Sequence, residues 1–151
     1  MSSSLQIDKK TEYQSDTELS GHPEHTKPLV LVVENHEDTR FMLRMMLEMR
    51  GFRVTEAGNG LEAVEIALRE APELILMDGS LPLLDGLSAT RRIRAQTLQK
   101  VKIVAISGDA RPKFQMAARA AGCDDCLLKP IDFGQLEAIL GSSFDKLTMT
   151  A

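Results

Sequence analysis

The chain has 151 residues, of which 43% are hydrophobic and none is Trp, so it can form one soluble domain with an aliphatic core. The net charge of −4 argues against a dedicated nucleic-acid binder, and no apolar run is long enough to cross a bilayer. Residues 1–27 are polar and lack the apolar core of a signal peptide. We therefore expect a flexible N-terminal tail, a cytoplasmic protein and two reduced cysteines.

Strands and helices are predicted to alternate over residues 28–141, and a second polar tail is expected at 142–151. Apolar and β-branched runs predict five strands, at 29–33, 52–57, 73–78, 101–107 and 125–129. Helical patterns follow each strand, at 39–50, 60–71, 87–96, 113–121 and 133–140. No internal repeat is visible.

The helix ends carry recognisable signals. Asp38, Asn59 and Asp132 precede helices and can cap them, whereas Gly51 and Gly122 can end them. The expected core face of the first helix holds Phe41, Met42, Met45, Met46 and Met49, and that of the second holds Leu61, Val64, Ala67 and Leu68. We therefore expect the methionines to pack in the core rather than to line a groove for a partner.

Strands joined by helices run parallel with right-handed crossovers, and nearly all-apolar strands are covered on both faces. The sequence thus predicts an α/β fold, a doubly wound (βα)5 sandwich with a five-stranded parallel sheet. Ligands bind such sheets at the carboxyl ends of the strands.

Polar residues gather at those predicted strand ends: Glu34, Asn35, Asp78, Ser107 and Lys129. Carboxylate and carbonyl oxygens suit Mg²⁺, while a lysine and a hydroxyl suit a phosphoryl group. No glycine-rich nucleotide-binding loop is present. The set describes a phosphoryl-transfer site without a nucleotide.

Four segments, "VLVVENHEDTR", "LILMDGSLPLLDG", "VAISGDA" and "GCDDCLLKPID", stand in an order and spacing that resemble a response-regulator receiver domain of two-component signalling. The resemblance covers about Pro28 to Leu140. It implies a flavodoxin-like sheet of strand order 2-1-3-4-5 and a phosphorelay role, in which a histidine kinase or phosphotransfer protein phosphorylates an aspartate with Mg²⁺. The chain would act through a downstream protein effector, with no output domain attached.

By that resemblance, Asp78 matches the phospho-acceptor, and Ser107 and Lys129 match the residues that contact the phosphoryl group. The metal would be held by Glu34, Asn35, Asp78 and the backbone carbonyl of Ser80. Pro130 matches a proline that follows a cis bond. The turn after the acceptor strand matches at Pro82, Asp85 and Gly86. Family members often form homodimers through the fourth helix, fifth strand and fifth helix.

The chemistry of these residues agrees with that assignment. Asp78 must be ionised to attack phosphorus, and Lys129 and Mg²⁺ favour the ionised form. Gly79 and Gly108 carry no side chain that could obstruct a donor. We therefore expect Asp78 to be the exposed tip of a rigid strand.

Two positions depart from the family. Asn35 stands where a second acidic residue is usual, so metal affinity should be weakened. Glu37 or Asp38 could compensate, although both suit a helix start, and His36 is expected to be a surface residue rather than a ligand. Cys126 replaces an aromatic residue that often switches with the site, so output would travel through the Ser107 loop and the neighbouring helix.

Other functions stay open. A pseudo-receiver would use the same fold as a phosphorylation-independent binding module. Cys123 and Cys126 form a C-x-x-C pair that can be redox-active, but structural burial is favoured. A small phosphatase-like hydrolase is the remaining enzyme class. The cognate kinase, effector and stimulus cannot be read from the sequence.

Overall fold

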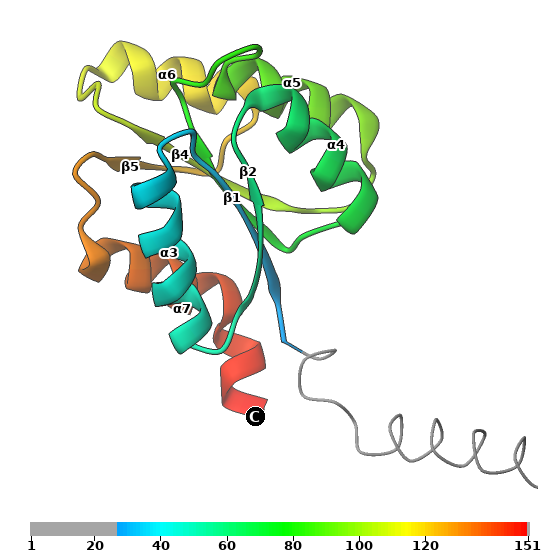
Figure 1. Ribbon diagram of the computed structural model, residues 1–151, viewed down its shortest axis with the longest axis vertical. Coiled ribbons are helices and arrows are strands. Elements are labelled where there is room, and N and C mark those ends of the chain that lie inside the picture. The colour runs from blue at the N-terminus through cyan, green and yellow to red at the C-terminus, as the bar shows by residue number, and fades with distance from the viewer. Residues whose placement is uncertain (1–26, 151) are drawn as a thin grey trace, which may run out of the picture.

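A computed structural model describes residues 27–150, with side chains described as far as Phe144. Five parallel strands form one sheet in the order β2-β1-β3-β4-β5 (Figure 1). The strands are β1 (Leu29–Val33), β2 (Arg53–Ala57), β3 (Leu74–Asp78), β4 (Lys102–Ser107) and β5 (Asp125–Leu128). This order confirms the predicted sheet. Residues 1–26, where most of the N-terminal tail was expected, lie outside the described residues.

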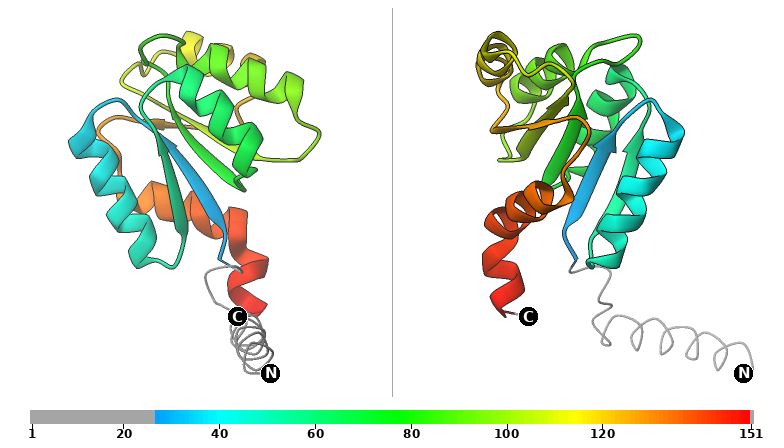
Figure 2. Two further views of the ribbon diagram at one scale, coloured as in Figure 1. Left: turned by 45° about the vertical axis from the view of Figure 1, so that its right-hand side comes forward. Right: turned by 90° about the vertical axis from the view of Figure 1, so that its left-hand side faces the viewer.

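Helices cover both faces of the sheet, which makes the fold a doubly wound (βα)5 sandwich (Figures 1 and 2). The described helices are α3 (Glu37–Met49), α4 (Gly60–Glu70), α5 (Gly86–Gln96), α6 (Pro112–Ala121) and α7 (Phe133–Thr150). Helices α3 and α7 lie on one face, and α4, α5 and α6 lie on the other. Within the described part of the chain, no helix combines the length and apolarity that a bilayer span requires.

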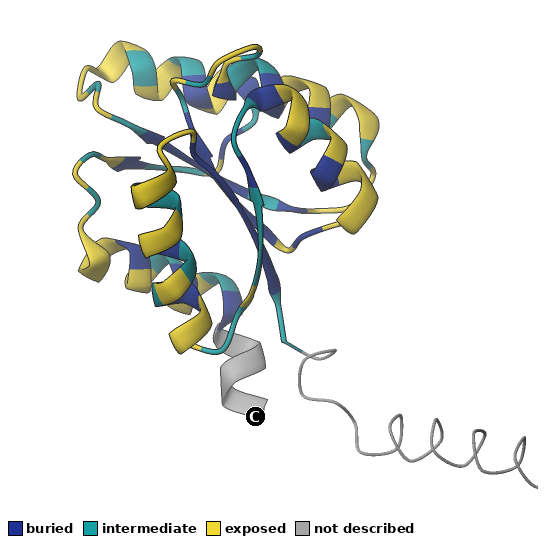
Figure 3. Cartoon of the chain, viewed as in Figure 1, coloured by how far each residue is buried: buried dark blue, intermediate teal, exposed yellow. Residues whose placement is uncertain are grey.

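The core has two layers, one on each side of the sheet. Every residue of β1 and β3 is buried, because these strands lie in the interior of the sheet with helices on both faces (Figure 3). Alternate residues along them face opposite layers, so Leu31 and Ile75 pack beneath α4–α6 while Val30 and Leu76 pack beneath α3 and α7. The sheet is therefore a fixed frame for whatever stands at its edges.

The expected core face of α3 is wrong. Leu43 and Leu47 are the residues of this helix that are buried against the sheet. Met46 is partly buried, whereas the other four residues of the predicted face are exposed: Phe41, Met42, Met45 and Met49. The apolar residues of α3 point in most directions around the helix axis, so their spacing does not identify one buried face. Only the narrow stripe formed by Leu43 and Leu47 is buried against the sheet, and it is offset by one residue from the predicted face.

The predicted caps at helix starts are present except at α3. Asn59 accepts a hydrogen bond from the Glu62 backbone at 2.8 Å, and Asp132 caps α7 through the Gly134 backbone at 2.8 Å. Helix α3 instead begins after His36, with no side-chain cap, and Asp38 lies in its first turn. Asp38 is therefore not the cap but an acidic residue at the positive end of the helix dipole.

In α4 the expected stripe is only partly correct. Ala67 is buried and Val64 packs on the core, but Leu61 and Leu68 are exposed. The buried face is completed by Ala63 and Ile66.

The last helix continues past residue 141, where the C-terminal tail was expected to begin. Phe144 is buried, and its ring centroid lies 5.2 Å from that of Phe52 in a tilted arrangement. Such aromatic pairs add stability beyond the area that they bury. Phe144, which was expected to lie in the tail, thus belongs to the core layer on the α3 and α7 side of the sheet.

Candidate functional site

The carboxyl ends of β1, β3 and β5 bring three charged side chains together. The Lys129 Nζ lies 3.0 Å from Asp78 Oδ2 and 3.6 Å from Glu34 Oε1. On the other side of Asp78, the Ser80 backbone N–H donates to Oδ1 at 3.0 Å. Residues from positions 34, 78 and 129 therefore form one site, as the strand-end rule predicts.

Asp78 is not the exposed tip that the sequence suggested, because only 1% of it is accessible. The Lys129 side chain, 30% exposed, bonds its carboxylate. Gly79 does not leave open space either: a Cβ at this position would lie 3.2 Å from Phe114 Cζ. Asp78 and the backbone beside it are thus covered by groups that come from other parts of the chain.

Glu34 is also buried, and its carboxylate is held by His36. The His36 backbone N–H donates to Glu34 Oε2 at 3.0 Å, and its Nδ1 lies 2.8 Å from the same oxygen. The Arg40 guanidinium donates to the Glu34 carbonyl at 2.6 Å. His36 is a surface residue, as expected, but it also fixes the orientation of the Glu34 side chain.

Burial has opposite outcomes for the two carboxyl groups. Burial raises the pKa of Asp78, and the negative charge of Glu34 raises it further. The hydrogen bond from the Ser80 N–H and the contact with Lys129 act to lower this pKa but do not outweigh the burial. Burial also acts to raise the pKa of Glu34, but hydrogen bonds from His36 and the charge of Lys129 outweigh it and lower that pKa. The hydrogen bonds and charges around Glu34 therefore offset its burial, whereas those around Asp78 do not.

The loop after β3 is anchored by helix α5. Asp85 caps α5 by accepting a hydrogen bond from the Ser88 backbone at 2.9 Å. The first residue of the helix, Gly86, donates its N–H to the Gly79 carbonyl at 3.1 Å. The turn expected at Asp85 and Gly86 thus holds the backbone next to the acceptor.

Ser107, at the end of β4, is joined to the site through the backbone. Its carbonyl accepts the Lys129 N–H at 2.8 Å, and its Oγ accepts the Asp109 N–H at 2.9 Å. No hydrogen bond joins Ser107 to Asp78 within the described residues. The Lys129–Pro130 bond is cis, as predicted.

A family model for the response regulator receiver domain matches residues 30–141. The chain belongs to this family. The receiver domain of the sensor histidine kinase PA1611 from Pseudomonas aeruginosa, crystallised with a magnesium ion in its active site cleft, is 37% identical. It gives a TM-score of 0.72 and covers 79% of this chain and 98% of its own. The predicted flavodoxin-like fold is thereby confirmed.

Two further relatives place this receiver in the family. The receiver of Saccharomyces cerevisiae Ssk1, solved with the histidine phosphotransfer protein Ypd1, is 29% identical with a TM-score of 0.70, covering 76% of this chain and 87% of that one. An uncharacterized 14.6 kDa protein of Leptolyngbya boryana is 38% identical over 104 residues, 68% of this chain and 79% of that protein. Other relatives are much longer: the chain spans 17% of two-component system protein A of Emericella nidulans.

The donor groups of this receiver fit a hard cation. Glu34 and Asp78 are both nearly inaccessible, and one ammonium, that of Lys129, lies within salt-bridge distance of each. Two buried carboxylates against one lysine leave an excess negative charge that a divalent cation would offset. The described residues contain no group of three His, Cys, Asp or Glu that could hold a metal. Asn35, which follows Glu34 in the chain, is exposed.

Neither cysteine of the receiver lies in surroundings that favour a reactive thiolate. Both are free, Cys123 is buried and Cys126 is half-buried. Burial raises the pKa of both thiols, which disfavours the reactive thiolate. These observations count against a C-x-x-C oxidoreductase.

Two residues at the site, Arg40 and Phe114, were not predicted from the sequence. Arg40 could have been predicted, because it lies near the start of the helix that follows Glu34. Phe114 could not, because its contact with Gly79 joins positions 35 apart through the packing of α6 on the sheet.

Proposed function

We propose that the chain is a phospho-accepting receiver of a two-component phosphorelay. Asp78 takes a phosphoryl group from a phosphohistidine of a histidine kinase or phosphotransfer protein, and the change alters the binding of a downstream effector. The observation that carries the proposal is the position of Asp78, held at a sheet edge between Lys129 at 3.0 Å and the Ser80 N–H at 3.0 Å.

In this reaction an Asp78 carboxylate oxygen forms a bond to phosphorus as the P–N bond of the donor breaks. Lys129 is the group that covers the carboxylate, and its flexible side chain moves aside and then pairs with the phosphoryl oxygens. Glu34, Asn35, Asp78 and the Ser80 carbonyl would hold Mg²⁺, whose charge offsets that of the phosphoryl oxygens when it is bound.

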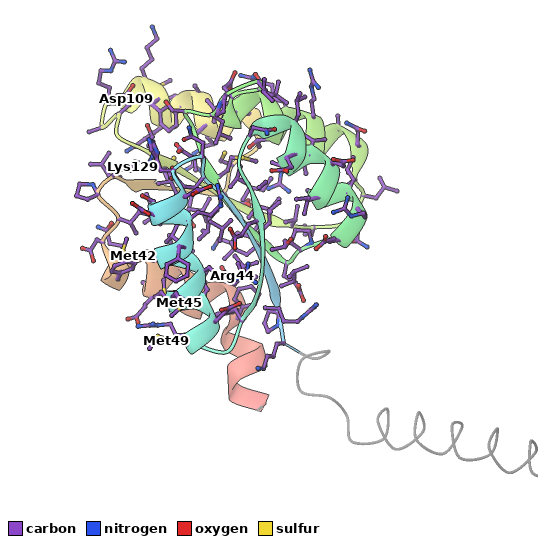
Figure 4. The ribbon with its side chains drawn as sticks, viewed as in Figure 1. Met42, Arg44, Met45, Met49, Asp109 and Lys129 are labelled. Carbon is purple, nitrogen blue, oxygen red and sulfur yellow. The ribbon has the colours of Figure 1, made fainter. Side chains whose placement is uncertain are left out.

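The phosphodonor would dock on the exposed apolar face of α3. Figure 4 shows Met42, Met45 and Met49 along this helix, with Lys129 beyond its N-terminal end. Phe41 completes the patch, which is exposed although large apolar side chains favour burial. The complex of Ssk1 with Ypd1 shows that a related receiver binds a phosphotransfer protein. Met45→Lys should reduce transfer from a phosphotransfer protein, whereas Met116→Lys, exposed on α6, should not.

A pseudo-receiver is the second candidate, and the burial of Asp78 together with Asn35 favours it. The test is the intact mass of the protein after incubation with Mg²⁺ and acetyl phosphate. A gain of one phosphoryl group that is absent in Asp78→Asn supports the phospho-accepting receiver. Asp124→Asn, at an exposed position just before β5, is the matched control and should still gain the group. No gain in the folded protein, either in the natural chain or in Asn35→Asp, would instead establish the pseudo-receiver.

A further inference from the structure

Phe114 packs beside Gly79 and also lines a surface cavity. A Cβ on Gly79 would lie 3.2 Å from its Cζ and 3.3 Å from its Cε1, so the ring fills the space where a side chain at 79 would stand. Gly79 follows Asp78 directly, and its N–H donates to the Ile106 carbonyl at 2.9 Å. Phe114 therefore packs on the backbone segment that carries the acceptor.

Phe114 also borders a cavity of about 230 Å³ that reaches Ser107, Cys126, Leu128 and Gln135. An apolar cavity of about 150 Å³ is large enough for benzene, so this one has room for a phenyl ring. The short Cys126 side chain helps to leave that room. Phe114 and Cys126 are both partly buried against the same core layer, beneath α6.

The ring also belongs to a segment that can respond to Ser107. Residues 108–111 form the short link from β4 to α6, and Phe114 lies in the first turn of that helix, where its N–H donates to the Arg111 carbonyl at 3.0 Å. The Ser107 hydroxyl bonds the Asp109 N–H at the start of the link. A phosphoryl group that attracts this hydroxyl would release the link from its present hydrogen bond.

We propose that Phe114 relays the state of Asp78 to the surface between α6 and β5. In the unmodified protein the ring rests on Gly79. After phosphorylation the Ser107 link moves, and the ring turns into the cavity beside Cys126. This relay rests on the proposed phosphorylation of Asp78 and adds to it the route by which that change would reach a partner.

The test is fluorine NMR of protein labelled with para-fluorophenylalanine, with Mg²⁺ and beryllium fluoride as the phosphoryl mimic. The chain has five phenylalanines, and Phe114→Leu identifies the Phe114 signal. We expect this signal to shift on addition of the mimic. The Cys126 thiol, measured in a Cys123→Ser background, should react several-fold more slowly with a thiol reagent because the ring then covers it.

Two substitutions at one position separate the relay from a general effect of the mimic. Cys126→Phe fills the cavity, so the Phe114 signal should no longer shift. Cys126→Ser keeps the cavity open, so the shift should persist. Independently of the mimic, Gly79→Ala should displace the Phe114 signal, since the added methyl group meets the ring.

Binding of the mimic is followed separately through the backbone amide of Ser107. If that amide shifts while the Phe114 signal stays fixed, the relay is wrong and the proposed function stands. If neither responds at saturating Mg²⁺, the proposed function fails and the relay fails with it. An unchanged Phe114 signal in Gly79→Ala would overturn the contact on which the relay depends.

Discussion

Helix α5 begins at Gly86, which lies directly against the end of β3, so Gly86→Ala tests how the site is held. A Cβ at this position would lie 2.9 Å from the Asp78 carbonyl carbon, 3.0 Å from the Gly79 Cα and still closer to the Asp78 carbonyl oxygen. All three atoms belong to backbone, which cannot move aside as a flexible side chain could. The methyl group must therefore push the start of α5 away from the end of β3.

Three effects set the size of the change. Overpacking costs about 1–3 kcal/mol. Loss of the hydrogen bond from the Gly86 N–H to the Gly79 carbonyl costs about 1 kcal/mol. The better helix propensity of Ala returns at most about 1 kcal/mol. We expect a net loss of about 2 kcal/mol in the free energy of unfolding, or roughly 8 °C in Tm for a domain of this size.

Urea and thermal unfolding, followed by circular dichroism, measure the change. Gly141→Ala is the matched control, because it makes the same substitution in α7 with nothing within 4 Å of the new Cβ. This control should stabilise the protein by up to about 1 kcal/mol through propensity alone. If Gly86→Ala were as stable as the natural protein, the close packing of α5 on the acceptor strand would be refuted.

Further predictions concern the metal site, an ion pair and the end of α7. Asn35→Asp should lower the Mg²⁺ concentration needed for phosphorylation several-fold, because it adds a carboxylate to the donor set; an unchanged Mg²⁺ titration would place residue 35 outside that set. Burial acts to raise the pKa of Glu56, but Arg44 and Arg40 outweigh it and lower that pKa. The stabilisation from Glu56 is therefore present above the pKa of the unfolded chain and is lost as pH falls through the lower folded pKa. Glu56→Gln should cost about 1 kcal/mol at neutral pH, and urea titrations should show this difference shrinking in acid. Phe144→Ala should cost about 3 kcal/mol in the same assay, whereas a loss near zero would show that the chain at Phe144 is not part of the core.

The predicted strands and the charged cluster at their ends could be anticipated because they depend on local patterns and one topological rule, whereas the strand order was anticipated from the resemblance to receiver domains. An apolar run that ends in Asp78 defines a buried strand, and parallel strands place their ends at a common edge. The meeting of Lys129 with Asp78 follows from that rule, although it joins positions 51 apart.

Two predictions that were wrong, the core face of α3 and the exposure of Asp78, depend on packing between distant parts of the chain. Helix α3 contains seven apolar residues that point in most directions around its axis. Which of them are buried, Leu43 and Leu47 rather than the neighbouring methionines, is therefore decided only by contact with the sheet. Lys129, just after β5, covers the Asp78 carboxylate, and Phe114 of α6 packs against the neighbouring Gly79; nothing next to Asp78 in the sequence indicates either contact. Solvent exposure of a site residue is therefore harder to predict than its place in the fold.

The methionines on the outer face of α3 lie open to oxidants in solvent. Met49, 78% exposed, is the most accessible of them. Peroxide converts a thioether to a polar sulfoxide, which methionine sulfoxide reductases can reverse. The fully buried residues of α3, Leu43 and Leu47, contain no sulfur, so oxidation of the exposed methionines would change the outer surface while the domain stays folded. An aged sample would then keep its melting temperature and yet present a wetter, less adhesive helix to any protein that approaches it.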